Sequence, residues 1–484
     1  MKTTTLGELK KKGVPPQFRS VRDEIRQNLI EKLRKDEDVL PGIVGFDETV
    51  KPAVINALLS RHDFILLGLR GQAKSRILRG ITQLLDDEIP VIAESEINDD
   101  PFFPISDVSR RRIELEADQL PIRFLTREDR YVEKLATPDV TVADIVGDLD
   151  PIKAARRGTS LSSFENIHFG LLPRAHRGIF AVNELPDLAP KIQVALLNIM
   201  QEGDVQIRGF PVRLPLDVLL IFSANPEDYT ARGKIITPLK DRIGSEIRTH
   251  YPLRLRDAVR ITGQEAWTGR QEISTQMPEF ISEIIEMVAF VARQDSRIDR
   301  RSGVSQRMPI SCAESSISNA EQRALLNQED SATVRIADIY ASLPAITGKL
   351  ELEYEGELKG AERIGRELIQ LAVHEIFGRR FPENSFEQVV QWFNLGGEVQ
   401  VSEQTSDADY LQRIGQIQGV EVFFEQFQVD PRRAPGLAVS AAEFLLEGLC
   451  AQKKLSRSES KGYYKEPEDM DPFNALEANR QSFN

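Results

Sequence analysis

Short runs of consecutive apolar residues divide the first half of the chain. The runs are Phe64–Leu67, Ile179–Val182 and Val218–Phe222, and polar or glycine residues follow each run directly. Runs of this length without alternation are typical of strands buried on both faces, as in a parallel sheet. Apolar residues at helical spacing lie between them, at positions 77–85 and 192–200. This alternation of strands and helices predicts βαβ units around a parallel core sheet.

Three other stretches add detail to this pattern. Residues 90–93 read as a further strand after the first helix. Residues 94–176 have several prolines and no regular period, so we interpret them as an insertion with strands and loops of its own; the alternative is a passive surface excursion. Residues 203–215 alternate around Gly209-Phe210, which predicts a β-hairpin.

The chain becomes helical beyond residue 252. Apolar residues recur on one face between Ile281 and Val291, and again between Ile364 and Ile376, which predicts helices that pack through these faces. The patterns together predict five parts: an N-terminal helical arm at 1–39, an α/β core at 40–255, a helical part at 256–350, a further helical domain at 351–455 and a polar tail at 456–484.

Composition narrows the class of protein. The chain has 484 residues and a formal charge of −13. Nucleic-acid binding needs clustered Lys and Arg, so this charge argues against a dedicated nucleic-acid binder. Cys312 and Cys450 are far apart and form no metal-type pair, which favours structural thiols in a reduced cytosolic setting. No apolar run approaches the length of a membrane span or forms a signal core, so we expect a cytoplasmic protein.

A glycine-rich loop follows the first apolar run. It fits the phosphate-loop template of Gly, four variable positions, Gly, Lys and Ser or Thr, except at the second glycine. Its backbone N–H groups would point at phosphate oxygens, the lysine would reach the β- and γ-phosphates of ATP, and the serine hydroxyl would hold Mg²⁺. The residues are Gly68, Leu69, Arg70, Gly71, Gln72, Ala73, Lys74 and Ser75.

Ala73 stands where the template has its second glycine. A positive φ at this position would strain an alanine, whereas a helical conformation would make the alanine harmless. The loop alone is also compatible with a glycine-rich turn after a core strand, so its interpretation depends on residues further along the chain.

Polar residues end the later predicted strands. Asn183-Glu184 and Asn225 follow two apolar runs, and Arg242 comes 17 residues after Asn225 (242 − 225). Phosphoryl transfer to water needs such a set: a carboxylate that polarises water, a polar residue that positions it, and an arginine that offsets charge on the γ-phosphate. Each residue also has an ordinary structural reading, as a helix-terminal carboxylate, a turn former or a surface ion pair. Their joint order favours the catalytic reading.

Residues 40 to about 310 resemble an AAA+ ATPase, and in particular the ATPase subunit of magnesium chelatase and its MoxR-type relatives. Ile145–Asp150 resembles the chelatase segment VGTLD, and Gly170–Gly178 is similar to its PGLLARAHRG segment before the Walker B strand. The hairpin at 203–215 matches the family's hairpin ahead of sensor 1. Val44 and Gly45 fall on the segment beside the adenine.

The resemblance implies roles for further residues. Glu184 falls on the catalytic base, Asn225 on sensor 1, Arg242 on the arginine finger and Arg307, in Val304-Ser305-Gln306-Arg307, on sensor 2 of the lid at 256–350. Walker B normally ends in Asp-Glu, and Asn183 takes the place of the aspartate that supports the Mg²⁺ shell. Asparagine can accept a hydrogen bond from a metal-bound water but supplies no charge.

The resemblance also implies an α/β fold with a parallel five-stranded AAA+ core sheet, and a homo-oligomeric ring, most simply a hexamer, that binds ATP and Mg²⁺ between protomers. Such a ring would hydrolyse ATP and remodel a partner protein, for which a protein with a von Willebrand-type domain is one candidate. Two alternatives stay open. Ala73 and Asn183 favour an ATP-gated scaffold with little hydrolysis. A DNA-acting AAA+ protein is disfavoured by the acidic charge and by the lack of a GAFTGA loop.

Overall fold

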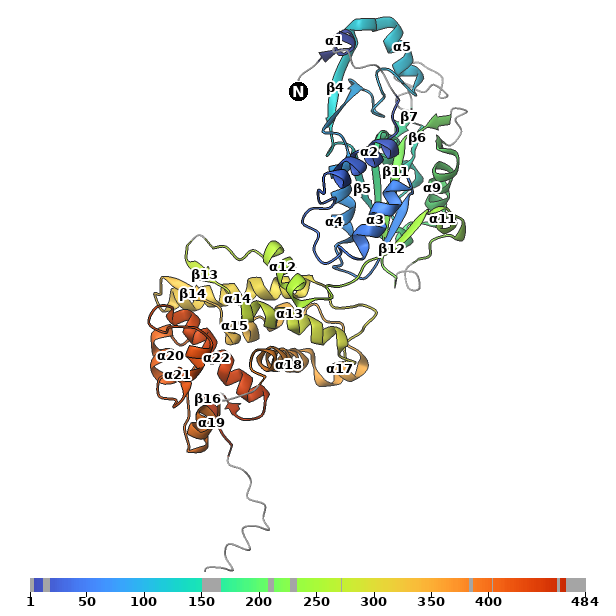
Figure 1. Ribbon diagram of the computed structural model, residues 1–484. Coiled ribbons are helices and arrows are strands. Elements are labelled where there is room, and N and C mark those ends of the chain that lie inside the picture. The colour runs from blue at the N-terminus through green and yellow to red at the C-terminus, as the bar shows by residue number, and fades with distance from the viewer. Residues whose placement is uncertain are drawn as a thin grey trace, which may run out of the picture. The chain divides into compact units, whose positions relative to one another are not determined.

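The computed structural model describes residues 4–11, 18–149, 167–207, 213–226, 233–270, 272–382, 386–402, 404–458 and 462–466. The chain folds into two compact units, Met1–Tyr251 and Pro252–Asn484 (Figure 1). We call them the first and the second unit and describe each by itself.

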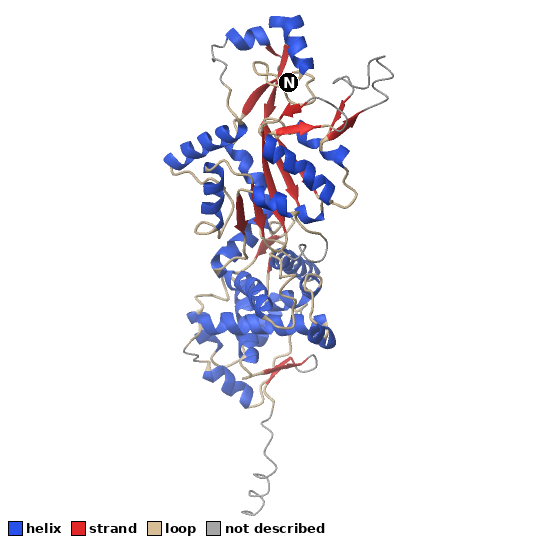
Figure 2. Cartoon of the chain, turned by 90° about the vertical axis from the view of Figure 1, so that its right-hand side faces the viewer, coloured by secondary structure: helices blue, strands red, loops and turns tan. Residues whose placement is uncertain are grey.

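A parallel sheet of five strands forms the centre of the first unit (Figure 2). Its order is β12 (Ser245–Arg248), β2 (Phe64–Leu67), β11 (Val218–Ala224), β8 (Gly178–Asn183) and β5 (Tyr131–Leu135). All neighbouring pairs run parallel. The predicted five-stranded parallel sheet is therefore confirmed, and the three apolar runs form its interior strands.

Helices cover both faces of this sheet (Figure 1). On one face α2 (Val21–Arg34), α3 (Val50–Leu59) and α4 (Lys74–Gly80) share a core with the sheet. On the other face α9 (Pro190–Glu202) and α11 (Thr237–Arg242) do so. Because successive side chains of a strand point to opposite faces, each apolar run contributes to both cores. This double burial explains why the runs show no alternation.

The strand predicted at 90–93 does not join the core sheet. It forms β3 (Glu88–Ile92), which pairs antiparallel with β4 (Pro121–Thr126), and β4 in turn pairs with β1 (Thr4–Thr5) in a separate sheet. Pro90 has no N–H to donate, which suits β3 to its edge position. The core sheet instead takes its edge strand β5 from within the stretch that we interpreted as an insertion. β5 reads Tyr-Val-Glu-Lys-Leu, and none of its side chains is fully buried, so it gives no apolar run.

The other elements of the first unit are short. They include an antiparallel pair of β6 and β7 and a second antiparallel pair of β9 and β10, whose connecting residues 208–212 lie outside the described residues. The elements are α1 (Leu6–Lys11), η1 (Ile81–Leu84), α5 (Asp107–Glu116), η2 (Ala117–Gln119), α6 (Val142–Ile145), β6 (Gly147–Leu149), β7 (Ile167–Phe169), α8 (Leu171–Arg174), η4 (Leu185–Asp187), β9 (Asp204–Gln206) and β10 (Arg213–Pro215).

The second unit is mainly helical (Figure 2). One hydrophobic core runs from Ile273 to Tyr463 and so spans position 350 without a break. Within the described part of the chain, no helix is both long and apolar enough to cross a membrane. The elements of this unit are α12 (Leu255–Glu265), β13 (Ser274–Gln276), α13 (Glu279–Gln294), α14 (Arg307–Leu326), β14 (Ser331–Thr333), α15 (Ile336–Ala341), α16 (Leu343–Thr347), α17 (Tyr354–Lys359), α18 (Ala361–Arg380), α19 (Glu387–Asn394), α20 (Asp407–Ile414), α21 (Val420–Gln426), α22 (Pro435–Ala451), β15 (Ser456–Ser458) and β16 (Gly462–Tyr464).

Candidate functional site

The glycine-rich loop connects β2 to α4 and is held in place from outside. Gly68 donates its N–H to the Ala224 carbonyl, with 3.2 Å between N and O. A Cβ at Gly68 would lie 1.9 Å from Thr249 Oγ1 and 2.2 Å from Gln72 Oε1, so only glycine fits there. The Thr249 hydroxyl donates to Gln72 Oε1 at 2.8 Å, and the Tyr251 hydroxyl donates to the Arg70 carbonyl at 3.0 Å. The residues after β12 therefore fix the shape of the loop.

Lys74 is buried inside this loop. Its ammonium donates to the carbonyl oxygen of Gly68 and, at 3.0 Å, to that of Leu69. Gly71 has a φ of +73°, as expected for a glycine in a tight turn. Ser75, the next residue of α4, is exposed. A buried ammonium and an accessible hydroxyl thus lie side by side at the start of α4.

The conformation of Ala73 decides between the two readings of this departure from the template. Ala73 precedes α4 with φ +55° and ψ +16°, which is the left-handed region. An L-residue with a Cβ pays about 1–2 kcal/mol for this conformation. Alanine is therefore strained in the loop, where a glycine would not be.

Glu184 is strained in the same way. It follows directly on β8, with φ +55° and ψ +48°, and its side chain is half-buried. Left-handed non-glycine residues persist only where the surrounding structure holds them, and they concentrate at functional sites. Because parallel strands end at one edge of the sheet, Glu184 lies at the same edge as the loop.

Asn183 has both ends of its side-chain amide engaged. Its Nδ2 donates to Glu133 Oε1 of β5, and its Oδ1 accepts a hydrogen bond from the Ser223 hydroxyl of β11 at 2.8 Å. Glu133 was missed by the sequence reasoning. A glutamate in a half-polar strand gives no signal on its own. Only the parallel register, with Leu135 opposite Asn183, brings the two side chains together.

Asn225 follows directly on β11 at the same edge. The residue is only 2% exposed, and among the described residues its buried Oδ1 has no hydrogen-bond partner. Leaving a buried acceptor unsatisfied costs about 1–3 kcal/mol, and native proteins do so rarely. An orphaned amide oxygen at this position suits a residue whose partner is a water or a ligand.

The remaining predicted residues precede α3 or belong to α11 and α14. Gly45 has a φ of +80°, beside Val44, in the turn before α3. Arg242 ends α11 with its side chain 35% exposed, and its Nη1 donates to the Pro238 carbonyl at 3.0 Å. Arg307 is the exposed first residue of α14 in the second unit.

The end of the core sheet where its strands begin, which we call the amino-terminal edge, is also polar. Arg130, just before β5, forms a buried two-pronged ion pair with Glu24 of α2, with N–O distances of 2.6 and 2.7 Å. Arg130 Nε also donates to the Arg177 carbonyl at 2.8 Å, and Glu24 Oε1 accepts the Asp86 N–H at 2.7 Å. Every nitrogen and oxygen named here has a partner, so this edge reads as structural.

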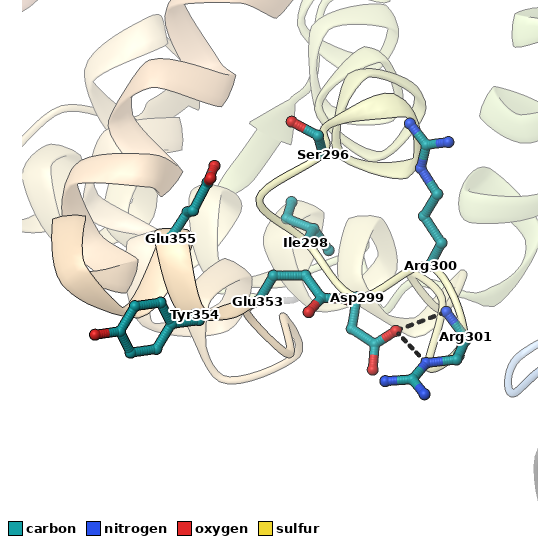
Figure 3. A pocket seen from close by; sticks show the side chains of 8 residues that line it. All are labelled: Ser296, Ile298, Asp299, Arg300, Arg301, Glu353, Tyr354 and Glu355. Atoms are coloured by element: carbon teal, nitrogen blue, oxygen red, sulfur yellow. Dashed lines mark hydrogen bonds and ion pairs between the residues drawn. The ribbon is translucent and has the colours of Figure 1, made fainter.

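The second unit has a hollow of its own. It measures about 700 Å³ and is open to solvent (Figure 3). Two of its charged residues pair with one another, since Asp299 Oδ1 accepts from the N–H and the Nε of Arg301 at 2.8 and 3.3 Å. None of the predicted site residues lines it. The lining residues are Ser296, Ile298, Asp299, Arg300, Arg301, Glu353, Tyr354 and Glu355.

Two comparisons agree with this geometry. The model of the Sigma-54 interaction domain matches residues 156–244, a stretch that includes Asn183, Glu184, Asn225 and Arg242. The magnesium-chelatase 38 kDa subunit of Cereibacter sphaeroides is 29% identical over 230 residues, which are 46% of this chain and 63% of that protein. This chain carries an AAA+ ATPase domain related to that of magnesium chelatase. The predicted Walker A loop lies between β2 and α4, and the predicted Walker B residues lie at the end of β8.

Other similarities are shorter or weaker. The hydrogenase transcriptional regulatory protein HoxA of Cupriavidus necator is 35% identical over 103 residues, 21% of each chain. A complex of subunits BchI and BchD of magnesium chelatase aligns at 19% identity over 66% of this chain and 97% of that chain, with a TM-score of 0.35, too low to carry an argument. The chain spans 21% and 63% of the two curated relatives' own lengths.

Proposed function

We propose that this protein binds and hydrolyses ATP with Mg²⁺ at the carboxyl-terminal edge of the core sheet. One observation carries the proposal: a buried Lys74, a strained Glu184 and the orphaned oxygen of Asn225 occur at the same edge of one sheet. In structural polar clusters, the buried polar atoms normally all have hydrogen-bond partners. Binding and catalytic sites more often contain strained backbone and buried polar atoms without a partner.

The residues present fit a nucleotide and its metal. The loop closes so tightly around Gly68 that a Cβ would collide with Gln72 and Thr249, as expected where backbone must approach phosphates closely. Within the described residues no group of three His, Cys, Asp or Glu side chains could hold a metal alone. Mg²⁺ at nucleotide sites is usually held by phosphates together with one or two side chains, and Ser75 and Asn183 would serve here.

Each residue then has a distinct task. Lys74 neutralises charge at the β- and γ-phosphates, and Glu184 takes a proton from the attacking water. Asn225 holds that water through its unsatisfied Oδ1. Mg²⁺ would supply charge stabilisation between the phosphates. Val44 and Gly45 would border the adenine.

The finer proposal concerns assembly. Arg242 is a partly exposed guanidinium on the first unit, which suits an arginine that acts on the nucleotide of a neighbouring protomer. We propose a homo-oligomeric ring, most simply a hexamer, and Arg307 stays the predicted sensor 2 residue of the second unit. The ring would remodel a partner protein, and a partner with a von Willebrand-type domain fits the relationship to magnesium chelatase.

Glu184→Gln tests the proposed hydrolysis. The substitution keeps the shape of the side chain and removes the base, so ATP should stay bound while turnover falls by about two to four decades. ATP binding by calorimetry and phosphate release are measured on the same preparations. Glu202→Gln, at the exposed end of α9, serves as the control and should keep wild-type turnover. Equal turnover in the Glu184→Gln variant and the wild type would contradict the assigned base.

An ATP-gated scaffold is the second candidate. The left-handed Ala73 and the uncharged Asn183 both favour slow turnover. This candidate replaces the first when wild type binds ATP but releases no phosphate in the presence of Mg²⁺.

The match to the Sigma-54 interaction domain keeps a DNA-acting function as a third candidate. The charge of −13 and the absence of a GAFTGA sequence from the chain weigh against it. Salt-dependent binding to duplex DNA at physiological ionic strength would favour it over the other two.

A further inference from the structure

Glu133 of β5 is a carboxylate in direct contact with the altered Walker B position. It accepts the hydrogen bond from Asn183 Nδ2, and it belongs to the neighbouring strand rather than to the Walker B strand. We propose that Glu133 supplies the negative charge that a Walker B aspartate would bring to the Mg²⁺ shell, and that it does so by orienting the amide of Asn183. This inference rests on the proposed ATP and Mg²⁺ site.

Strand register puts the participating groups on one face of the sheet. Glu133 lies opposite Ala181 and Leu135 opposite Asn183, so Glu133 and Asn183 point to the same side. Ser223 shares this side, because Phe222 is paired with Val182 and the next positions lie beside one another.

Helix α4 covers the same face. Its Ile77 and Leu78 pack in one core with Ala181 and Ile221, which share the face of Asn183 and Ser223 along β8 and β11. The helix that starts with Lys74 and Ser75 therefore lies over the face that carries Asn183. The polar groups at its edge belong to the nucleotide site and not to the opposite face of the sheet.

The hydrogen bonds fix the direction of the amide. Nδ2 of Asn183 donates to the Glu133 carboxylate, and Oδ1 faces the Ser223 hydroxyl. A flipped amide would bring Oδ1 against a carboxylate, which cannot donate, and would lose the bond to Glu133. Oδ1 consequently lies on the side of β11, the strand that pairs with β2 ahead of the phosphate loop, and keeps a second lone pair for a metal-bound water.

Charge explains why residue 183 is an asparagine here. An aspartate at 183 would put a second carboxylate in contact with Glu133, and like charges at such a distance repel strongly. The pair thus carries one negative charge, as an unaccompanied Walker B aspartate does. Outer partners of metal ligands change metal affinity by about 10- to 100-fold when they are removed.

Arg79 offers the competing explanation. Its Nε lies 2.9 Å from Glu133 Oε2, and its side chain is 66% exposed. Glu133 would then be only the partner of a surface arginine. The arginine is largely open to solvent, which screens its charge, while the Glu133 side chain is only 19% exposed and its Oε1 is left for Asn183.

A charge-swap series separates these explanations. The variants are Glu133→Gln, Asn183→Asp, their combination, and Arg79→Gln as the control. For each variant, calorimetry gives the ATP affinity in Mg²⁺ and in EDTA, and the ratio of the two measures the contribution of the metal. Bound Mn²⁺, measured by electron paramagnetic resonance in the presence of ATP, gives metal affinity without any turnover.

We expect Glu133→Gln to lower the metal contribution about tenfold or more while ATP binding in EDTA persists. Asn183→Asp alone should lower the melting temperature in EDTA, because two carboxylates then touch. The combined variant, with one carboxylate and one amide exchanged, should recover both the metal contribution and the melting temperature. Arg79→Gln should leave both near the wild-type values.

The opposite results overturn the inference. An unchanged metal contribution in Glu133→Gln, or the same loss in Arg79→Gln, would make Glu133 a partner of Arg79 only. Failure of the combined variant to recover would also contradict the exchanged charge. Among the results of this series, only a wild type that binds no ATP even in EDTA would overturn the proposed nucleotide site itself.

Discussion

The two edges of the core sheet are both polar and differ in one respect. At the amino-terminal edge, Arg130 and Glu24 form a buried pair whose nitrogens and oxygens all find partners. At the carboxyl-terminal edge, Asn225 Oδ1 finds none in the described part of the chain. Left-handed non-glycine residues occur at both edges, with Ala73 and Glu184 at the carboxyl-terminal edge and Arg61 and Arg177 at the amino-terminal edge. The buried acceptor without a partner at Asn225, and not backbone strain, is therefore what distinguishes the two edges.

This difference separates structural from functional polarity. Burying charged groups is tolerated when they are paired and hydrogen-bonded, so the Arg130–Glu24 pair needs no ligand to explain it. A buried acceptor without a partner persists only when something else is gained. Binding and turnover of a nucleotide would give that gain at one edge. Variants at the carboxyl-terminal edge should therefore change ATP binding or turnover, and variants at the amino-terminal edge should change the free energy of unfolding.

The largest effect is expected at Arg242. An arginine supplied by a neighbouring protomer is worth about three to five decades of rate in phosphoryl transfer. Arg242→Ala should remove ATPase activity without weakening ATP binding, and wild-type activity per protomer should rise steeply with protein concentration. Arg248→Ala, an exposed arginine of β12, is the matched control and should retain activity.

Mixing tests the same point more sharply. Inactive Arg242→Ala and inactive Glu184→Gln protomers should regain partial activity together, because a mixed interface can join an intact base to an intact finger. Activity that does not depend on concentration, with no rescue on mixing, would return Arg242 to an ordinary surface arginine.

Stability should respond most at the amino-terminal edge. Arg130→Met leaves Glu24 buried without its partner, which costs about 3–5 kcal/mol of unfolding free energy. Combining it with Glu24→Met should recover much of the loss, because two apolar side chains replace the pair. Denaturant unfolding gives both values. A loss below about 1 kcal/mol for Arg130→Met would show that the pair is not the structural element we describe.

Asp217, also at the amino-terminal edge, should make stability depend on pH. Burial raises the pKa of its carboxyl to about 6. A folded-state pKa above the unfolded value means that the native state holds the proton more tightly, so stability is lost as the pH rises from about 4 through 6. Asp217→Asn should therefore be more stable than wild type at pH 8, by roughly 1–3 kcal/mol, with the gain disappearing below about pH 4. Parallel stability curves for the two proteins would contradict this assignment.

The smallest effect is expected at Ala73. Ala73→Gly relieves the left-handed conformation but adds freedom to the unfolded chain, so a net stabilisation of about 0.5–1 kcal/mol remains. Ala53→Gly in α3, a right-handed helical position, should instead destabilise by about 1 kcal/mol. Thermal unfolding of the two variants tests whether their changes in unfolding free energy have opposite signs. A loss of stability at both positions would mean that alanine is not strained in the loop.

The sequence predicted the parts of this picture that depend on local pattern. The spacing of Gly68, Gly71, Lys74 and Ser75 located the loop, and the unbroken apolar runs located the interior strands. The sequence did not predict the edge strand β5, because a strand at the edge of a sheet needs no run of apolar residues. The φ of Ala73 could not be read from residue type, since the sequence left both a helical and a left-handed conformation open.

Contacts between segments that are distant in the sequence could not be predicted either. Glu133 and Asn183 are 50 positions apart, and only the register of β5 against β8 joins them. The pairing of Arg130 with Glu24 spans 106 positions and likewise depends on how α2 lies on the sheet. Such contacts are set by the packing of elements, which residue patterns along the chain do not encode.

The central claim is that ATP binds at the carboxyl-terminal edge, and ATP-dependent thermal stabilisation tests it most directly. At ATP near 100 times its dissociation constant, binding should stabilise the native state by about 2.7 kcal/mol. We predict this increment for wild type and for Arg130→Met, whose starting stability is lower, and no increment for Lys74→Ala, whose starting stability is close to that of wild type. Equal ATP stabilisation of Lys74→Ala and wild type would contradict the account.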